Sequence, residues 1–149
     1  MYKWAFKFKS LFIDKNTLYQ DKLIKQLHKE HQKLFQLYTK ITETSSERKK
    51  LSLLKKFYYD YHLHILKEDK QLYTHLLIKY TFVREKYNII LQKQEEMQGI
   101  TAFIEDFATK YSNIEALKTE EFKKDLETLG GALVKRVEFE ENELYKYYE

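Results

Sequence analysis

The chain has 149 residues, of which 43% are hydrophobic, 34% charged and 16% aromatic, with three Gly, no Pro and no Cys. This length suits one domain with a single core, and the scarcity of Gly and Pro favours long helices over β folds with many turns. The lack of cysteine excludes disulfides, thiolate metal sites and a cysteine nucleophile. No apolar run approaches the roughly 18 residues of a membrane span and no signal-peptide core is present, so we expect a cytoplasmic protein.

The net charge of +4 is concentrated at the beginning of the chain. Residues 1–15 contain four Lys and one Asp, interleaved with aromatic residues that include Trp4, Phe6 and Phe8. We predict that this segment is a lid packed across the end of the domain; a membrane-surface arm is the alternative that we favour less. The remaining residues are nearly neutral, so the sequence predicts no nucleic-acid partner.

Residues 17–41 are predicted to form the first helix. Apolar and aromatic residues recur there at steps of three and four, with His31 as the single ionisable group in the seam formed by Ile24, Leu27, His31, Leu34, Tyr38 and Ile41. Thr44 followed by Glu47 fits a capping box, which predicts that the second helix begins near residue 45.

The second predicted helix, residues 45–80, carries two ionisable groups in its buried stripe. At helical spacing the stripe contains Phe57, Tyr61, His64, Glu68, Leu72 and His75. His64 and Glu68 lie one turn apart, and a His and a carboxylate at that spacing can hold one cation in the core of a bundle. They can equally form a buried hydrogen-bonded pair without metal.

Two further helices are predicted at residues 81–111 and 120–147, joined by a loop at 112–119. The seam of the third helix has no ionisable group over its central turns and reads Ile90, Met97, Ile100, Ile104, Phe107 and Tyr111. The fourth has two such groups, in a seam of Phe122, Leu126, Leu129, Leu133, Arg136, Glu140, Leu144 and Tyr147. Residues 16–149 are therefore predicted to form an all-α, antiparallel up-down-up-down four-helix bundle.

The ionisable seam residues are expected to meet at one height of this bundle. In an antiparallel bundle, two residues at one height are centred on the turn between their helices. The midpoints of His31 with His64, of Glu68 with Met97 and of Met97 with Arg136 fall at or near the three connections. One layer should thus contain His31, His64, Glu68, Met97, Arg136 and Glu140, although buried ionisable residues are rare.

These motifs resemble the hemerythrin-like (HHE cation-binding) family, a four-helix bundle that holds a dinuclear iron centre. The resemblance rests on residues 30–35 (EHQKLF), 64–73 (HILKEDKQLY) and 136–145 (RVEFEENELY). It implies that His31, His64, Glu68 and Glu140 retain one half of the metal site. The His residues of the other half are absent, since Arg136 replaces one of them and the third helix offers Met97 and Thr101.

A second resemblance is to the bacterial regulators that sequester the primary sigma factor. Residues 125–136 (DLETLGGALVKR), followed by Glu140 and Glu141, are similar to their last helix, and residues 106–111 (DFATKY) to their third. This resemblance implies the same fold with a protein partner and no metal.

Two interpretations of the buried layer therefore stay open. In the first, His31, His64, Glu68 and Glu140 bind one Fe, Mn or Zn ion, Arg136 offsets surplus carboxylate charge, and the protein senses oxygen or redox state or stores metal. In the second, no metal is bound, and Arg136 with one protonated His balances Glu68 and Glu140. His28, which flanks the first seam, could be a reserve ligand or could support the site, but we expect it to be half-exposed. We expect no enzyme, because no nucleophile arrangement or phosphate-binding loop is present.

Overall fold

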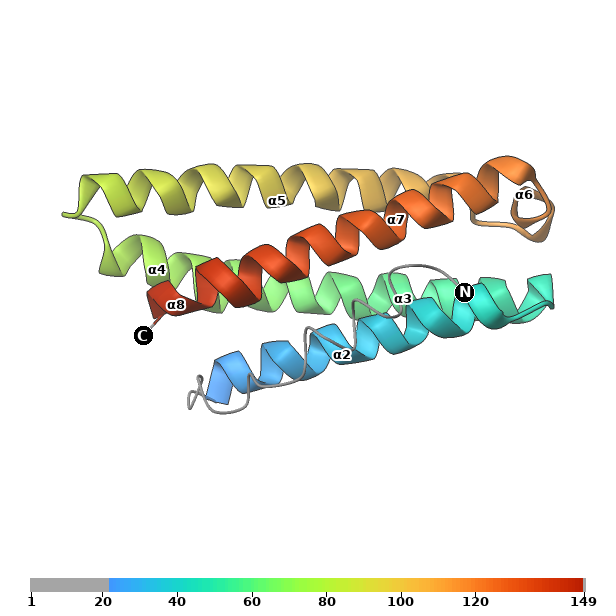
Figure 1. Ribbon diagram of the computed structural model, residues 1–149, viewed down its shortest axis with the longest axis horizontal. Helices are drawn as coiled ribbons and strands as arrows, with labels where there is room; N and C mark the ends of the chain where they lie inside the picture. Colours follow the sequence, from blue (N-terminus) through green and yellow to red (C-terminus); the bar gives the residue numbers. More distant parts are fainter. Residues whose placement is uncertain (1–21, 149) are drawn as a thin grey trace.

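Four antiparallel helical rods form the fold, which is seen along its length in Figure 1. The computed structural model describes residues 22–148, and within these residues it contains no strand. The first rod is α2 (Lys22–Glu43), and the second runs through α3 (Glu47–Lys67), the π-helical segment η1 (Glu68–Tyr73) and α4 (Thr74–Lys79). The third is α5 (Arg84–Lys110), and the fourth combines α7 (Glu120–Phe139), η2 (Glu140–Leu144), also π-helical, and α8 (Tyr145–Tyr148). The predicted all-α four-helix bundle is confirmed.

The predicted N-terminal segment, residues 1–15, and the predicted start of the first helix lie outside the described residues. The proposed division of the chain at residues 15 and 16 therefore stays a prediction. None of the helices within residues 22–148 has both the length and the apolar character needed to cross a membrane.

The connections between the helices differ in detail from the sequence predictions. Ser46 caps α3, because the hydroxyl of Thr44 instead donates to the Lys40 carbonyl and extends the preceding helix; the predicted capping box is wrong. The hydroxyl of Thr81 donates to carbonyls of the preceding turn, so α5 begins only at Arg84. The loop before α7 contains a short helix, α6 (Ile114–Leu117), which the Asn113 side chain caps.

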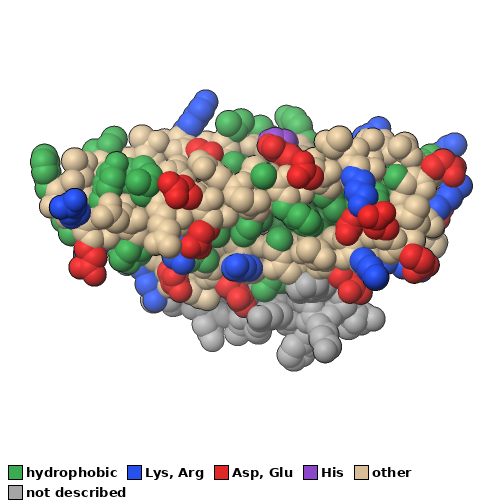
Figure 2. Space-filling model, turned by 90° about the horizontal axis from the view of Figure 1, so that it is seen from above, with side chains coloured by type: hydrophobic (Ala, Val, Ile, Leu, Met, Phe, Trp, Pro, Cys, Tyr) green, Lys and Arg blue, Asp and Glu red, His purple; other side chains and the backbone are tan. Residues whose placement is uncertain are grey.

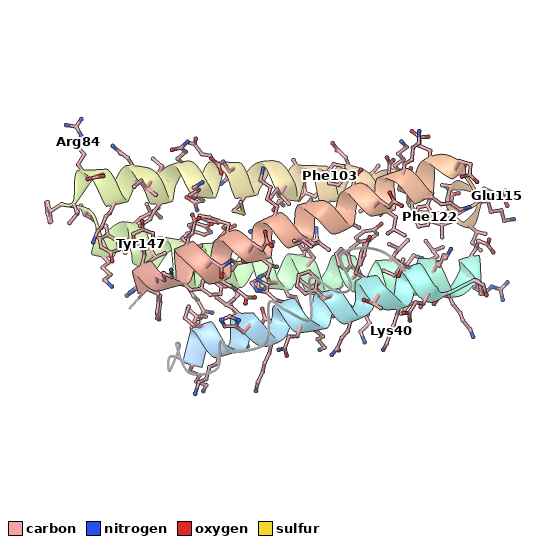
Figure 3. The ribbon with its side chains drawn as sticks, viewed as in Figure 1. Lys40, Arg84, Phe103, Glu115, Phe122 and Tyr147 are labelled. Atoms are coloured by element: carbon pink, nitrogen blue, oxygen red, sulfur yellow. The ribbon has the colours of Figure 1, made fainter. Side chains whose placement is uncertain are left out.

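The core consists of two apolar clusters, one toward each end of the bundle. One is built around Leu54, Phe57, Phe122 and Leu129, and the other around Ile24, Leu72, Ile90 and Leu144. Figure 3 marks the two ends, with Phe122 and Glu115 at one and Arg84 and Tyr147 at the other. Between the clusters lie six buried polar or charged residues, which are His31, His64, Glu68, Arg136, Glu140 and Glu141.

The outer surface mixes charges of both signs. On the face seen in Figure 2, Lys and Arg side chains alternate with Asp and Glu side chains, and hydrophobic side chains are exposed between them. This face has no large region of one charge, in keeping with the nearly balanced composition of the body of the chain.

Candidate metal centre

The two π-helical segments begin at the two carboxylates that the sequence placed in the buried layer. Glu68 opens η1 and Glu140 opens η2. A π turn inserts one residue into an α-helix and rotates everything after it, and such turns are frequent at functional sites. In the fourth rod this places both Glu140 and Glu141 in the interior, with exposures of 0% and 1%.

The same inserted residues explain two errors in the predicted stripes. After η1, the residue that faces the core is Leu76, whereas His75 is exposed and lies against Tyr148. After η2, Leu144 and Tyr145 are buried, whereas Tyr147 is half-buried. Regular helical spacing fails at these positions because it assumes 3.6 residues per turn throughout.

The six layer residues expected from the sequence lie together in the core. The ligand atoms of His31, His64, Glu68 and Glu140 all lie within 4.8 Å of one another. Arg136 is 3% exposed, and its Nε donates to Glu140 Oε1 over 2.6 Å. Met97 is buried beside them and contributes its carbonyl oxygen, which accepts from Arg136 Nη1 over 3.1 Å.

Each histidine of the layer lies between two carboxylates. His31 Nδ1 is 2.8 Å from Glu141 Oε2, and its Nε2 is 2.9 Å from Glu140 Oε2. His64 Nδ1 is 2.8 Å from Glu30 Oε1, and its Nε2 is 2.6 Å from Glu68 Oε1. Because an ionised carboxylate only accepts, each Nδ1 carries a proton when it meets Glu141 or Glu30. That leaves both Nε2 atoms directed at the carboxylates of Glu68 and Glu140.

Glu30 and Glu141 were not assigned a role from the sequence. Glu30 is half-buried and is also paired with Lys67. Glu141 additionally meets His28, whose Nδ1 is 2.9 Å from its Oε1. His28 is partly exposed, as expected, and it also contacts the site through Glu141. The direct neighbours Glu30–His31 and Glu140–Glu141 were visible in the sequence, but helical spacing places neighbours on different faces.

Glu68 has an environment that suits a cation. Both of its carboxylate oxygens are buried, and neither has a hydrogen-bond partner among the described residues. His64 Nε2 lies 2.6 Å from Glu68 Oε1 but forms no hydrogen bond with it. Buried carboxylate oxygens without partners are costly. A metal ion held jointly by His64 and Glu68 would remove this cost. The nitrogen and oxygen donors of His31, His64, Glu68 and Glu140 therefore suit a metal ion.

Burial and neighbouring charges shift the pKa values of the layer in opposite directions. Burial lowers the pKa of His31, but hydrogen bonds with Glu140 and Glu141 outweigh it, and the net shift is upward. Burial also opposes protonation of His64, yet the charge of Glu68 raises the pKa of that imidazole well above its usual value. Burial raises the pKa of Glu140, but the Arg136 guanidinium holds it well below the usual range. Burial and the charge of Glu140 raise the pKa of Glu68.

Arg136 occupies the part of the site where the third helix lacks ligands. Its Nη1 donates to Tyr61 Oη over 2.9 Å and to Thr101 Oγ1 over 3.0 Å. Beside it, a cavity of about 120 Å³ lies between η1 and α5, lined by Asp69, Gln94, Met97, Gln98, Thr101 and Arg136 among others. The guanidinium thus supplies a permanent positive charge beside the carboxylates of Glu140 and Glu68.

The metal-free network differs in one respect from the sequence interpretation. Glu68, Glu140 and Glu141 supply three buried carboxylates, whereas only two were expected. Arg136 and a single protonated histidine therefore leave one negative charge in excess. With all three carboxylates ionised, a neutral core without metal needs both His31 and His64 in their protonated forms.

Comparison with known proteins gives one match. The family model described as hemerythrin HHE cation binding domain matches residues 22–148. No curated protein and no solved structure matches the chain.

Proposed function

Because this chain belongs to the hemerythrin HHE cation-binding domain family, we propose that it binds one divalent metal ion through His31, His64, Glu68 and Glu140. The observation that carries the proposal is the orientation of the two histidines. In both histidines a carboxylate lies at Nδ1, and Nε2 is directed at Glu140 in the case of His31 and at Glu68 in the case of His64. A carboxylate on the far nitrogen fixes the tautomer of a metal-binding histidine and raises its basicity.

The charges of the core support one ion and not two. Three buried carboxylates carry three negative charges, and Arg136 carries one positive charge. One divalent ion with neutral histidines makes the core neutral, whereas a second would leave two excess positive charges in a low-dielectric interior. Glu30 and Lys67 pair with each other and do not change this balance.

Iron is the metal that we favour, with Mn and Zn as the alternatives, since imidazole and carboxylate suit all three. An iron ion with open coordination positions would bind a small ligand such as oxygen, and the cavity beside Arg136 offers such a molecule space near the site. We propose sensing of oxygen or redox state, or metal storage, and no enzymatic activity. A cytoplasmic location and the binding of a protein partner stay predictions.

Metal stoichiometry tests this function directly. The purified protein is loaded separately with Fe(II), Mn(II) or Zn(II), freed of excess metal and subjected to elemental analysis. We expect one ion per chain in the wild type and none in His64→Ala, since that change removes one of the four proposed ligands. The matched control is His62→Ala on the exposed face of the same helix, which should retain one ion. Absence of bound metal from the wild type under all three conditions would contradict the proposal.

A further inference from the structure

One buried aromatic residue contacts the candidate site without belonging to the predicted ligand set. Tyr145 begins α8, immediately after the π-helical segment η2, and it is 0% exposed. Its ring is stacked on His31 with 6.0 Å between the centroids and 7° between the planes. Its position is a consequence of the residue that η2 inserts, because regular spacing from Glu140 would favour Leu144 and Tyr147 instead.

The Tyr145 hydroxyl approaches two of the proposed ligand atoms equally. Tyr145 Oη is 3.4 Å from His31 Nε2 and 3.4 Å from Glu140 Oε2, and these two atoms are 2.9 Å apart. Ligand atoms at bonds of about 2.1 Å to one metal ion are separated by roughly 3.0 Å in octahedral and roughly 3.4 Å in tetrahedral geometry. The three atoms therefore have the spacing of neighbouring ligands around one ion.

We propose that Tyr145 is a further ligand of this metal site, binding iron through its phenolate oxygen when the iron is ferric. The inference rests on the proposed metal function and deepens it. Coordination replaces the phenolic O–H bond with an oxygen–iron bond, and the proton passes to bulk water. The phenolate is a hard oxygen donor, the kind of ligand that suits a highly charged cation.

The charge of the core supports this assignment. With Arg136 and three ionised carboxylates, a divalent ion gives a neutral interior, but a trivalent ion leaves one positive charge in excess. A phenolate at Tyr145 removes that excess without rearranging any other side chain. The core is then neutral in both iron states, with a neutral phenol beside ferrous iron and a phenolate on ferric iron, as a low-dielectric interior requires.

The second π-helical segment supplies a matched control. Tyr73 follows Glu68 by five residues, just as Tyr145 follows Glu140 by five. Tyr73 is also 0% exposed, but its hydroxyl forms no hydrogen bond with any described residue, the proposed ligands included. The two tyrosines are therefore alike in burial and position along their helices, and they differ in their approach to His31 and Glu140.

The experiment uses the full chain loaded with Fe(II) and then oxidised with ferricyanide, which accepts one electron per iron. Iron content is measured on each sample, together with visible absorption and resonance Raman spectra. We expect the wild type and Tyr73→Phe to show a phenolate-to-iron charge-transfer band with tyrosinate vibrations. Tyr145→Phe should lose both signals completely while still binding one ferrous ion per chain.

Each outcome decides the question. An iron-loaded wild type without the band, or a Tyr145→Phe variant that keeps it, would overturn the ligand assignment while leaving the metal site intact. Loss of the band in Tyr73→Phe with retention in Tyr145→Phe would assign the phenolate to Tyr73. That result would also overturn the assignment of Tyr145 as a ligand. A wild type that binds no iron would overturn the proposed function itself, and with it this inference.

Discussion

Arg136 is the side chain whose charge the buried layer needs whether or not metal is present. Its guanidinium meets Glu140 directly, and Nη2 lies 3.8 Å from Glu68 Oε1. Burial lowers the pKa of Arg136, but the charges of Glu140 and Glu68 outweigh it and raise that pKa, which keeps the group charged. A buried ion pair adds little net stability by itself, but removing one partner leaves the other charge buried and unpaired. Arg136 is therefore needed as long as the carboxylates are present.

Replacing Arg136 with Met keeps a long side chain and removes the charge. We expect a loss of about 3–5 kcal/mol in the free energy of unfolding, because a buried carboxylate loses its partner. Since three carboxylates exceed the charge of one divalent ion, the loss should be large with and without a chelator. Urea unfolding measures it, and Arg84→Met in the exposed first turn of α5 is the control, with an effect within about 0.5 kcal/mol. An Arg136→Met variant as stable as the wild type would mean that this residue is not in the core.

Glu30 allows the support of a histidine to be tested without touching a proposed ligand. Glu30 Oε1 accepts a hydrogen bond from His64 Nδ1. Burial raises the pKa of Glu30, but hydrogen bonds with His64 and Lys67 outweigh this effect and lower the pKa, so the carboxylate stays ionised. Glu30→Gln should weaken metal binding by about 10–100-fold, the usual effect of removing a carboxylate behind a metal-binding histidine. Competition with a chelator of known affinity measures this change. Glu143→Gln, on the exposed side of η2, should leave the affinity unchanged.

The π-helical segments are the elements on which the site depends. In η2 the extra residue lets Glu140 face Arg136 and both histidines while Glu141 meets His31 and His28. π-helical turns are rare overall but frequent at functional sites, and in η2 the buried carboxylates make contacts with Arg136 and His31 that favour this geometry.

Deleting Glu143 tests this dependence, because it removes one exposed residue from η2 and permits a regular α-helix. We expect lower stability in urea and loss of bound metal, since either Glu141 or the following Leu144 and Tyr145 must leave the core. The control is Glu143→Ala, which removes the same side chain without changing the register and should alter stability by about 0.5 kcal/mol or less. A deletion variant that binds metal normally would show that the inserted residue is dispensable.

At the scale of the whole molecule, the bundle is two apolar clusters joined through a layer that needs two additional positive charges. Those charges come either from protons on His31 and His64 or from one divalent ion. Metal binding should therefore release about two protons, and metal affinity should fall as the pH falls. The apolar clusters at the two ends hold the layer at one height in either state.

The stability of the metal-free protein should accordingly depend on pH. The folded-state pKa values of His31 and His64 are raised above 6.5, so their contribution is complete below that value and is lost as the pH rises through the folded-state pKa values. The folded-state pKa values of Glu140 and Glu141 are lowered below 4.5. For Glu141, burial raises the pKa, but hydrogen bonds with His28 and His31 outweigh this effect. The contribution of these two carboxylates to stability is therefore lost as the pH falls through their folded-state pKa values. We expect maximal stability between about pH 4.5 and 6.5.

With metal bound, the dependence above pH 6.5 should reverse, because the ion requires unprotonated histidine nitrogens. Urea unfolding between pH 5 and 8, with and without a chelator, checks both statements. A chelated protein that grows more stable from pH 6.5 to 8 would contradict the protonated-histidine network. The loaded protein should gain stability over the same range.

The resemblance to regulators that sequester a sigma factor predicted the same fold, so the fold does not separate that reading from a metal-binding one. The family match and the clustered donor atoms support cation binding. A protein partner stays a prediction, and a pull-down against the primary sigma factor would test it.

The sequence by itself determined the bundle and the height of its polar layer. Seam residues such as Ile24, His31 and Tyr38 are buried where helical spacing placed them, because an amphipathic helix has one face to remove from water. Short connections then make consecutive helices antiparallel, which brings His31, His64, Glu68 and Arg136 to one level.

Only the tertiary structure decided the residues beyond the two π turns and the partners of the histidines. No local signal distinguishes a π turn at Glu140 from an α turn, since the insertion is stabilised by contacts that Glu140 and Glu141 make with His31 on another helix. The burial of Tyr145 follows from that one-residue shift in η2, and the exposure of His75 follows from the corresponding shift in η1. Glu30 reaches His64 for a similar reason, because a contact between α2 and α3 depends on how their faces pack and not on the spacing within either helix.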